Sequence, residues 1–196
     1  MHTIAVIGAG TMGETLLSGL LRSGWAPDRL VATERRPDRA KELAERYGIR
    51  IVENDVAVAE ADVLVITVKP QDAPTLMAEL GPVVPASKLV ISICAGLPIS
   101  FFAKWLPEGT PVVRVMTNTP ALVDEAMTAI SAGPHATDEH VAIAEEMFRP
   151  VGRTVEVGHP HATEAERADR RTVPAKRPCE HLVILLVNAS PVWTME

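Results

Sequence analysis

Three glycines near the amino end of the chain have the spacing of a turn that binds a phosphate. Gly8, Gly10 and Gly13 directly follow the apolar run of residues 3–7 and form the pattern G-x-G-x-x-G. The pattern alone is weak, but here a short β-like run precedes it and a helix-like stretch, residues 12–22, follows it. Its position predicts the strand-to-helix turn at which the pyrophosphate of a dinucleotide binds.

Each glycine has a separate physical task in such a turn. Gly8 permits the tight turn off the strand, Gly10 lets the backbone approach the phosphates, and Gly13 lets the helix lie close to the sheet. The free N–H groups and the positive dipole end of the helix then face the anion. The alternative interpretation is an ordinary glycine-rich turn without a ligand.

Polar residues after the second expected strand stand where the adenosine ribose would be held. Glu34 lies about twenty residues beyond the glycine turn, where an acid holds the ribose hydroxyls of NAD. Arg35 and Arg36 follow it, and a guanidinium there pairs with the 2′-phosphate of NADP. We favour a coenzyme contact by Arg35, and NADP with it, while Glu34 keeps NAD open.

Strands alternate with helices along most of the chain, which predicts an α/β fold: a Rossmann-type, doubly wound, mostly parallel sheet. Ligands of such sheets lie at the carboxyl ends of the strands. The expected strands are residues 3–7, 30–33, 49–52, 63–68, 89–93, 112–115, 127–131 and 154–157. The expected helices are residues 12–22, 37–47, 54–60, 72–80, 98–106 and 137–148.

Three further strand ends face the same edge. Lys69 and Pro70 follow the run of residues 63–68, where backbone groups could border the coenzyme, although Lys69 also fits a surface lysine. The small residues 92–96 follow the next run and leave room for a flat nicotinamide. Cys94 among them fits a small buried hydrophobe better than a nucleophile, because no histidine is near it in sequence. Asn118 and Thr119 offer donors and acceptors after a later strand, or simply form a turn.

Composition excludes several classes of function. The formal net charge of −6 argues against a nucleic-acid or anionic membrane surface as partner. The two cysteines form no disulfide framework or zinc spacing, so no metal is expected. The amino end shows no signal peptide, and the apolar runs are far shorter than the ~20 residues that span a bilayer. These features predict a cytoplasmic protein.

The composition changes near Gly158, which divides the chain into a dinucleotide-binding domain, residues 1–158, and an irregular tail, residues 159–196. Residues 159–180 contain three prolines and almost no large apolar side chain, which predicts disorder. The apolar run of residues 182–187 is too short to cross a membrane. It fits an added strand, a partner-binding segment or an aggregation-prone segment.

The segments IAVIGAGTMGETLLSGLL, VLVITVKPQD, LVISICAGLPISFFAKWLP and VVRVMTNTPALVDEAMTAISAG resemble pyrroline-5-carboxylate reductases, in the same order over residues 1 to 157. The resemblance implies NADPH or NADH as coenzyme, a cytoplasmic location, and reduction of the cyclic imine 1-pyrroline-5-carboxylate to proline. It identifies no catalytic residue. The coenzyme contacts that it implies are Gly8, Ala9, Gly10, Thr11, Met12, Gly13, Arg35, Val68, Lys69, Pro70, Ala95, Gly96 and Asn118.

The chain also departs from the pattern of this family. Thr117 stands where the family has proline, and Asp124 and Ala126 stand where it has glycine. If those glycines serve a positive φ or a close approach, each change costs about 1 kcal/mol or more. The family's all-helical domain, which forms the dimer and contributes to the substrate site, is not recognisable in residues 159–196. That tail is suggestive of out-of-frame translation, and it makes the family's homo-oligomer doubtful here.

Two hypotheses of function follow. The first is a pyrroline-5-carboxylate reductase-like enzyme, in which coenzyme binding is expected but turnover is weak or absent. The second is a non-catalytic NAD(P)-binding module that acts through a partner. A third, another imine or β-hydroxyacid reductase, is disfavoured by the segment RVMTNTPALV.

Overall fold

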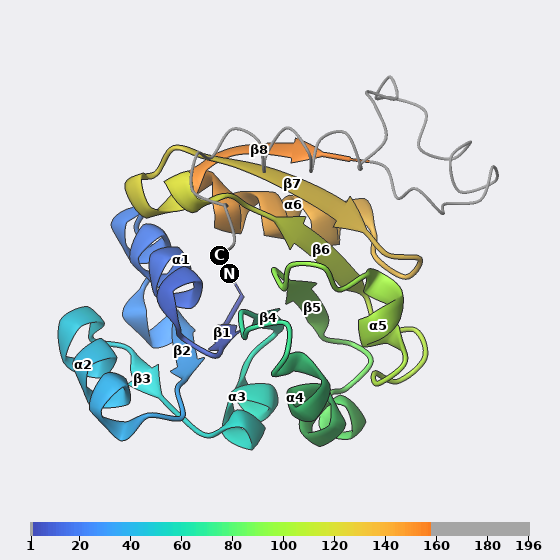
Figure 1. Ribbon diagram of the computed structural model, residues 1–196, viewed down its shortest axis with the longest axis horizontal. Coiled ribbons are helices and arrows are strands. Elements are labelled where there is room, and N and C mark those ends of the chain that lie inside the picture. Colours follow the sequence, from blue (N-terminus) through green and yellow to red (C-terminus); the bar gives the residue numbers. More distant parts are fainter. Residues whose placement is uncertain (1, 158–196) are drawn as a thin grey trace, which may run out of the picture.

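A single twisted sheet forms the centre of the protein (Figure 1). The computed structural model describes residues 2–157, so the expectations for residues 158–196 lie outside the described part. The strand order across the sheet is β3-β2-β1-β4-β5-β6-β7-β8. The strands are β1 (Ile4–Ile7), β2 (Leu30–Thr33), β3 (Arg50–Ile51), β4 (Val63–Ile66), β5 (Leu89–Ser92), β6 (Val112–Met116), β7 (Ala126–Ala132) and β8 (Gly152–Glu156).

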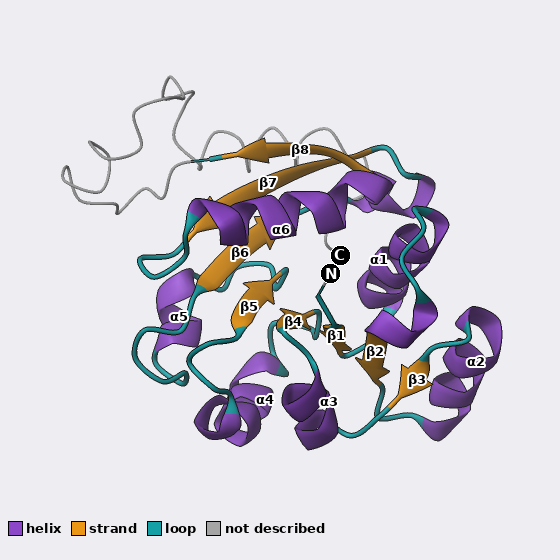
Figure 2. Ribbon diagram, turned by 180° about the vertical axis from the view of Figure 1, so that it is seen from behind, coloured by secondary structure: helices purple, strands orange, loops and turns teal. Residues whose placement is uncertain are grey.

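Helices cover both faces of the sheet, as two separate apolar clusters show. One cluster packs α1 and α6 against alternate side chains such as Val6 and Val65, and the other packs α3, α4 and α5 against Ala5 and Leu64. The two views of the ribbon show α3 and α4 together on one side of the strands (Figures 1 and 2). The helices are α1 (Thr11–Arg22), α2 (Pro37–Tyr47), α3 (Asn54–Glu60), α4 (Ala73–Leu80), α5 (Ile99–Ala103) and α6 (Asp138–Phe148).

The local sequence accounts for the ends of α2. Pro37 occupies the first helical position, where its missing N–H costs nothing. Gly48 ends the helix with φ of 65°, a left-handed conformation that glycine adopts without strain. Both ends were predicted from the sequence, and both are confirmed.

The first six strands run parallel in the order 3-2-1-4-5-6, which confirms the expected doubly wound architecture. The order reverses between β1 and β4, because α1 leads the chain outward to β2 and α3 brings it back to β4. This reversal lies at the glycine turn, and it leaves the crevice in which ligands of such sheets bind.

The last two strands differ in direction from the rest. β7 pairs antiparallel with β6, and β8 pairs parallel with β7. Between β6 and β7 the chain forms only the 3₁₀ turn Thr119–Val123 and no crossover helix. It therefore cannot return to the end of the sheet at which β6 began, as a parallel pairing would require. The helix expected over residues 98–106 is also shorter than predicted, because α5 ends at Ala103.

Of the two positions where the resembled family has glycine, one has the backbone that glycine favours. Asp124 has φ of 62°, the one non-glycine residue with positive φ in the described part of the chain. Its carboxylate accepts a hydrogen bond from Arg22 of α1, an exposed ion pair that contributes roughly 0–1 kcal/mol. Ala126 has no positive φ, but its backbone lies against Gly152, where a Cβ would come within 2.2 Å of the Ala126 oxygen.

The conformation of Asp124 makes a prediction for stability. Asp124→Ala and Asp124→Gly both lose the Arg22 pair, so their difference isolates the left-handed backbone, which costs a Cβ-bearing residue about 1 kcal/mol. We expect Asp124→Gly to be more stable than Asp124→Ala by about 1 kcal/mol. Urea unfolding of both variants measures this difference. An Asp124→Ala variant more stable than Asp124→Gly would show that the position carries no strain, because alanine loses less unfolded-state entropy at an unstrained position.

Candidate functional site

The glycine turn packs too closely against β4 for side chains at two of its positions. A Cβ on Gly8 would come within 2.5 Å of Cγ1 of Val68, and φ at Gly8 is +87°. A Cβ on Gly13 would lie 2.8 Å from Oγ1 of Thr67 and 3.0 Å from Cγ1 of Val6. Gly8 and Gly13 therefore let the amino end of α1 lie directly against the carboxyl ends of β1 and β4.

Gly10 is different, because the space beside it is open. A Cβ built on Gly10 meets nothing within 4 Å, and its φ of −70° is available to any residue. Packing within the protein therefore does not require glycine there. The open space lies directly at the start of α1, where a phosphate would approach the backbone.

The hydrogen bonds of the turn determine which amides remain for a ligand. Gly8 N donates to Oγ1 of Thr33, Ala9 N to the Thr33 carbonyl and Gly10 N to the Gly8 carbonyl. The first bond of α1 runs from Glu14 N to the Gly10 carbonyl. The amides that precede this ladder belong to Thr11, Met12 and Gly13, so these N–H groups and the positive end of the helix dipole are available to an anion.

An acidic side chain in the first turn of α1 points away to α2. The Glu14 carboxylate accepts hydrogen bonds from Arg39, Arg46 and Tyr47. Partial burial raises the pKa of Glu14, but the hydrogen bonds from these three residues and the charge of Arg39 outweigh it, so the pKa lies below its usual value. The charge of Glu14 is thus compensated by α2 and opposes an anion at the helix start less than a free carboxylate would.

The charged residues after β2 are one mostly buried acid, Glu34, and two exposed arginines, Arg35 and Arg36. Glu34 is only 12% exposed, and its Oε1 accepts a hydrogen bond from Arg36 N at 3.0 Å and lies 3.8 Å from the Arg36 guanidinium. Arg35 is 85% exposed, and its guanidinium lies 3.7 Å from Asp72 in a long ion pair. Arg35 therefore offers the more accessible cation at this edge.

The predicted residues beyond β4 line the same edge. Val68 contacts the glycine turn at Gly8, while Lys69 and Pro70 are exposed. The Cys94 thiol lies 3.3 Å from the Val68 carbonyl and is buried, and burial raises its pKa. A buried thiol with a raised pKa is a poor nucleophile, which agrees with the structural role expected for Cys94.

The predicted residues after β5 and β6 lie farther along the edge. Ala95 and Gly96 are exposed, and Gly96 has φ of +74° with open space beside it. Oδ1 of Asn118 accepts a hydrogen bond from Met127 N at 3.0 Å, which leaves its Nδ2 group for a ligand. Thr117, which replaces the family's proline, pairs its hydroxyl with Thr128 at 3.0 Å.

Sequence reasoning missed two residues at this edge, Thr33 and Thr67. Oγ1 of Thr67 donates to the Gly8 carbonyl at 2.6 Å, and Oγ1 of Thr33 accepts from Gly8 N at 3.1 Å. The sequence offers one signal for them. Thr33 ends the apolar run that forms β2, and Thr67 follows the apolar run that forms β4, the two strands that flank β1.

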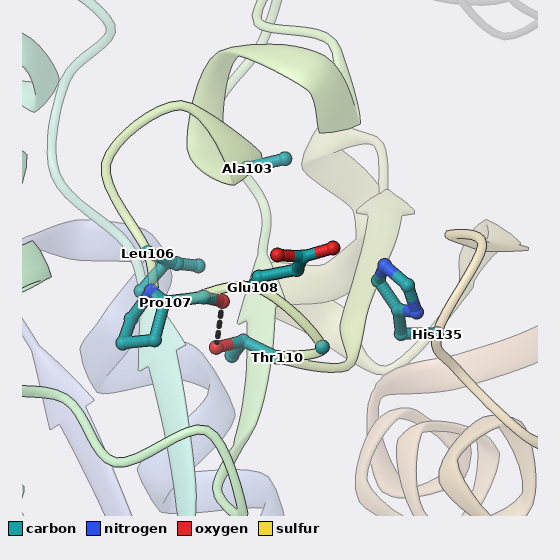
Figure 3. A pocket seen from close by; sticks show the side chains of 7 residues that line it. Ala103, Leu106, Pro107, Glu108, Thr110 and His135 are labelled. Atoms are coloured by element: carbon teal, nitrogen blue, oxygen red, sulfur yellow. Dashed lines mark hydrogen bonds between the residues drawn. The ribbon is translucent and has the colours of Figure 1, made fainter.

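One cavity lies along α1, beside this edge of the sheet, and another lies away from it. One, of about 190 Å³, opens along α1 between Glu14, Arg22, Tyr47 and Leu122. The other, of about 220 Å³, lies before the amino end of β6 and is bordered by Glu108, Thr110 and His135 (Figure 3). The second cavity is at the opposite end of the parallel strands from the glycine turn. No cluster of three or more potential metal ligands occurs among residues 2–157, and no helix in that range is long and apolar enough to span a membrane.

Comparison with known proteins places this geometry in context. The family described as "NADP oxidoreductase coenzyme F420-dependent" matches residues 3–96. A pyrroline-5-carboxylate reductase of Mycobacterium tuberculosis is 39% identical over 163 residues, covering 80% of this chain and 55% of that protein. The enzyme of the same name from Methanosarcina acetivorans is 41% identical over 156 residues, covering 79% of this chain and 58% of that protein.

Solved structures show the same relationship. A pyrroline-5-carboxylate reductase from Coxiella burnetii has a TM-score of 0.76 and 26% identity, covering 96% of this chain and 68% of that one. The Plasmodium falciparum pyrroline carboxylate reductase, solved with NADP bound, has a TM-score of 0.70 at 23% identity, covering 80% of this chain and 57% of that one. At this identity the second likeness concerns the fold.

The fold and the glycine turn define a Rossmann-type α/β domain, the class of fold that binds dinucleotides at such a turn. Within that class, over about four-fifths of its length, the chain is related to the pyrroline-5-carboxylate reductases. This relationship confirms the resemblance carried by the sequence segments above. The chain spans about half the length of the curated relatives that it matches.

Proposed function

We propose that this chain binds NADPH at the glycine turn and serves the reduction of 1-pyrroline-5-carboxylate to L-proline. The observation that carries the proposal is the open amino end of α1, held against β1 and β4 by Gly8 and Gly13, in a chain 39% identical to a pyrroline-5-carboxylate reductase. When bound, NADPH would supply a hydride from its nicotinamide C4 to the carbon of the cyclic imine.

The residues present fit a dinucleotide. The amides of Thr11, Met12 and Gly13 would hold the pyrophosphate, and the missing side chain of Gly10 leaves room for it. The carbonyl edge around Val68, Lys69 and Pro70 would border the middle of the coenzyme. Ala95, Gly96 and Asn118 would lie toward the nicotinamide, with the Asn118 Nδ2 group as a donor.

The adenosine end favours NADPH over NADH. The sequence left this preference open because Glu34 would repel a 2′-phosphate while the arginines attract it. The Glu34 carboxylate turns toward Arg36, whereas Arg35 stays exposed with one long ion pair. A 2′-phosphate would therefore meet the Arg35 guanidinium, in a charge-assisted contact that NADH cannot make.

Replacement of Arg35 tests this preference. We expect Arg35→Gln to weaken NADPH binding about tenfold, the effect of losing one charged hydrogen bond, and to leave NADH binding within about twofold. Arg36→Gln is the matched control, because Arg36 is already close to Glu34. Fluorescence titration with each coenzyme measures the affinities. Equal losses for NADPH and NADH in Arg35→Gln would contradict the assignment.

The substrate follows from the relatives. The 39–41% identity to pyrroline-5-carboxylate reductases supports a small cyclic imino acid as substrate and, with it, a cytoplasmic location. Hydride transfer to a protonated imine requires mainly that the two reacting carbons are held at near-attack distance. The described edge provides the coenzyme half of this arrangement, and we assign none of residues 2–157 to the substrate carboxylate.

A proline-forming assay separates this function from the second candidate, a non-catalytic NAD(P)-binding module that acts through a partner. With NADPH and 1-pyrroline-5-carboxylate, we expect coenzyme binding together with weak or no turnover by this chain alone, because no substrate-holding group is assigned. Proline formation, followed by NADPH oxidation and by amino-acid analysis, would support the enzyme even at a low rate. A rate typical of full-length reductases would refute the expectation of weak turnover.

A further inference from the structure

The glycine turn is held from both sides by threonine hydroxyls. β2 and β4 are the two neighbours of β1, and Ile7, the last residue of β1, pairs with Thr33 on one side and Ile66 on the other. Thr33 and Thr67 therefore stand level with the point at which the chain leaves β1 and enters the turn.

Each threonine hydroxyl forms a hydrogen bond with one backbone group of Gly8. The Thr33 hydroxyl accepts a hydrogen bond from Gly8 N at 3.1 Å, and the Thr67 hydroxyl donates to the Gly8 carbonyl at 2.6 Å. The Thr33 carbonyl also accepts from Ala9 N at 2.8 Å. Thr67 also lies beside the start of α1: a Cβ built on Gly13 would be only 2.8 Å from Oγ1 of Thr67.

From these contacts we propose that Thr33 and Thr67 are positioning residues for the coenzyme pyrophosphate. The inference rests on the proposed coenzyme binding at the turn. Glycine has more conformational freedom than any other residue, and Gly8 adopts φ of +87°. The two hydroxyls fix both peptide groups of Gly8, and so fix the direction in which the Thr11, Met12 and Gly13 amides point.

The arrangement also separates the amides of the turn into two groups. Those of Gly8, Ala9 and Gly10 serve the internal bonds of the turn, whereas those of Thr11 and Met12 precede the helical ladder. The threonines thus act through the turn and do not contact the coenzyme. β-Branching restricts χ1 of threonine, which keeps each hydroxyl aimed at Gly8.

Replacement of Thr67 by its hydroxyl-free isostere tests the proposal. We expect Thr67→Val to weaken binding of NADPH and of NADH by the same factor, about 5- to 20-fold, because both share the pyrophosphate. Thr67→Ser keeps the hydroxyl and should bind within about threefold of the unchanged chain. Affinities come from fluorescence titration of the full chain with each coenzyme.

Thr110→Val is the matched control for a purely structural effect. Thr110 is buried whereas Thr67 is half-buried, and the Thr110 hydroxyl donates to the Pro107 carbonyl at 2.7 Å (Figure 3). Thr110 precedes the amino end of β6, at the other end of the sheet from the glycine turn. We expect both valine variants to lower the melting temperature of the free protein similarly, and only Thr67→Val to lose coenzyme affinity. Unchanged affinity in Thr67→Val, or an equal loss in Thr110→Val, would overturn the proposal.

Amide hydrogen exchange on the unchanged chain tests the same point if Thr67→Val does not fold. The Gly8 and Ala9 amides should exchange slowly with or without NADPH, and the Thr11 and Met12 amides should slow only when NADPH is added. Fast exchange at Gly8 and Ala9 without NADPH would overturn the positioning role alone. If the unchanged chain binds neither NADPH nor NADH, the proposed function fails, and the role of the threonines fails with it.

Discussion

The close approach of α1 to the ends of β1 and β4 is the constraint on which the rest of the structure depends. Gly13 leaves no room for a Cβ between Thr67 and Val6, and Gly8 leaves none beside Val68. This contact places the amino end of α1, with its unpaired amides and dipole, over the point where the strand order reverses. The coenzyme proposal, the threonine contacts and the arrangement of the neighbouring strand ends all follow from that placement.

Charge is distributed around this helix end so that an anion is tolerated in a chain of net charge −6. The two acidic side chains nearest the turn and the adenosine end, Glu14 and Glu34, are both held by arginines or a backbone amide. Arg35 is left exposed beside them. Local geometry therefore leaves an exposed cation beside this edge, which the overall net charge does not reveal.

The sequence predicted the parallel part of the fold well, because apolar runs, the glycine turn and signals such as Pro37 and Gly48 are local. It predicted neither the antiparallel pairing of β7 nor the early end of α5, since both depend on tertiary contacts. For the same reason it favoured Arg35 but left NAD open through Glu34, and it missed Thr33 and Thr67. Their hydroxyls matter only because β2 and β4 flank β1, and spacing along the chain does not reveal that.

The affinity of a Gly10→Val variant for NADPH tests the central claim most directly. The open space and φ of −70° at Gly10 accommodate a valine side chain in the folded protein. A loss of NADPH affinity would therefore come from a clash with the coenzyme and not from disturbed packing. The account predicts at least a tenfold loss, about 1.4 kcal/mol, with a melting temperature close to that of the exposed control Ala86→Val. Unchanged NADPH affinity in a folded Gly10→Val protein would contradict it.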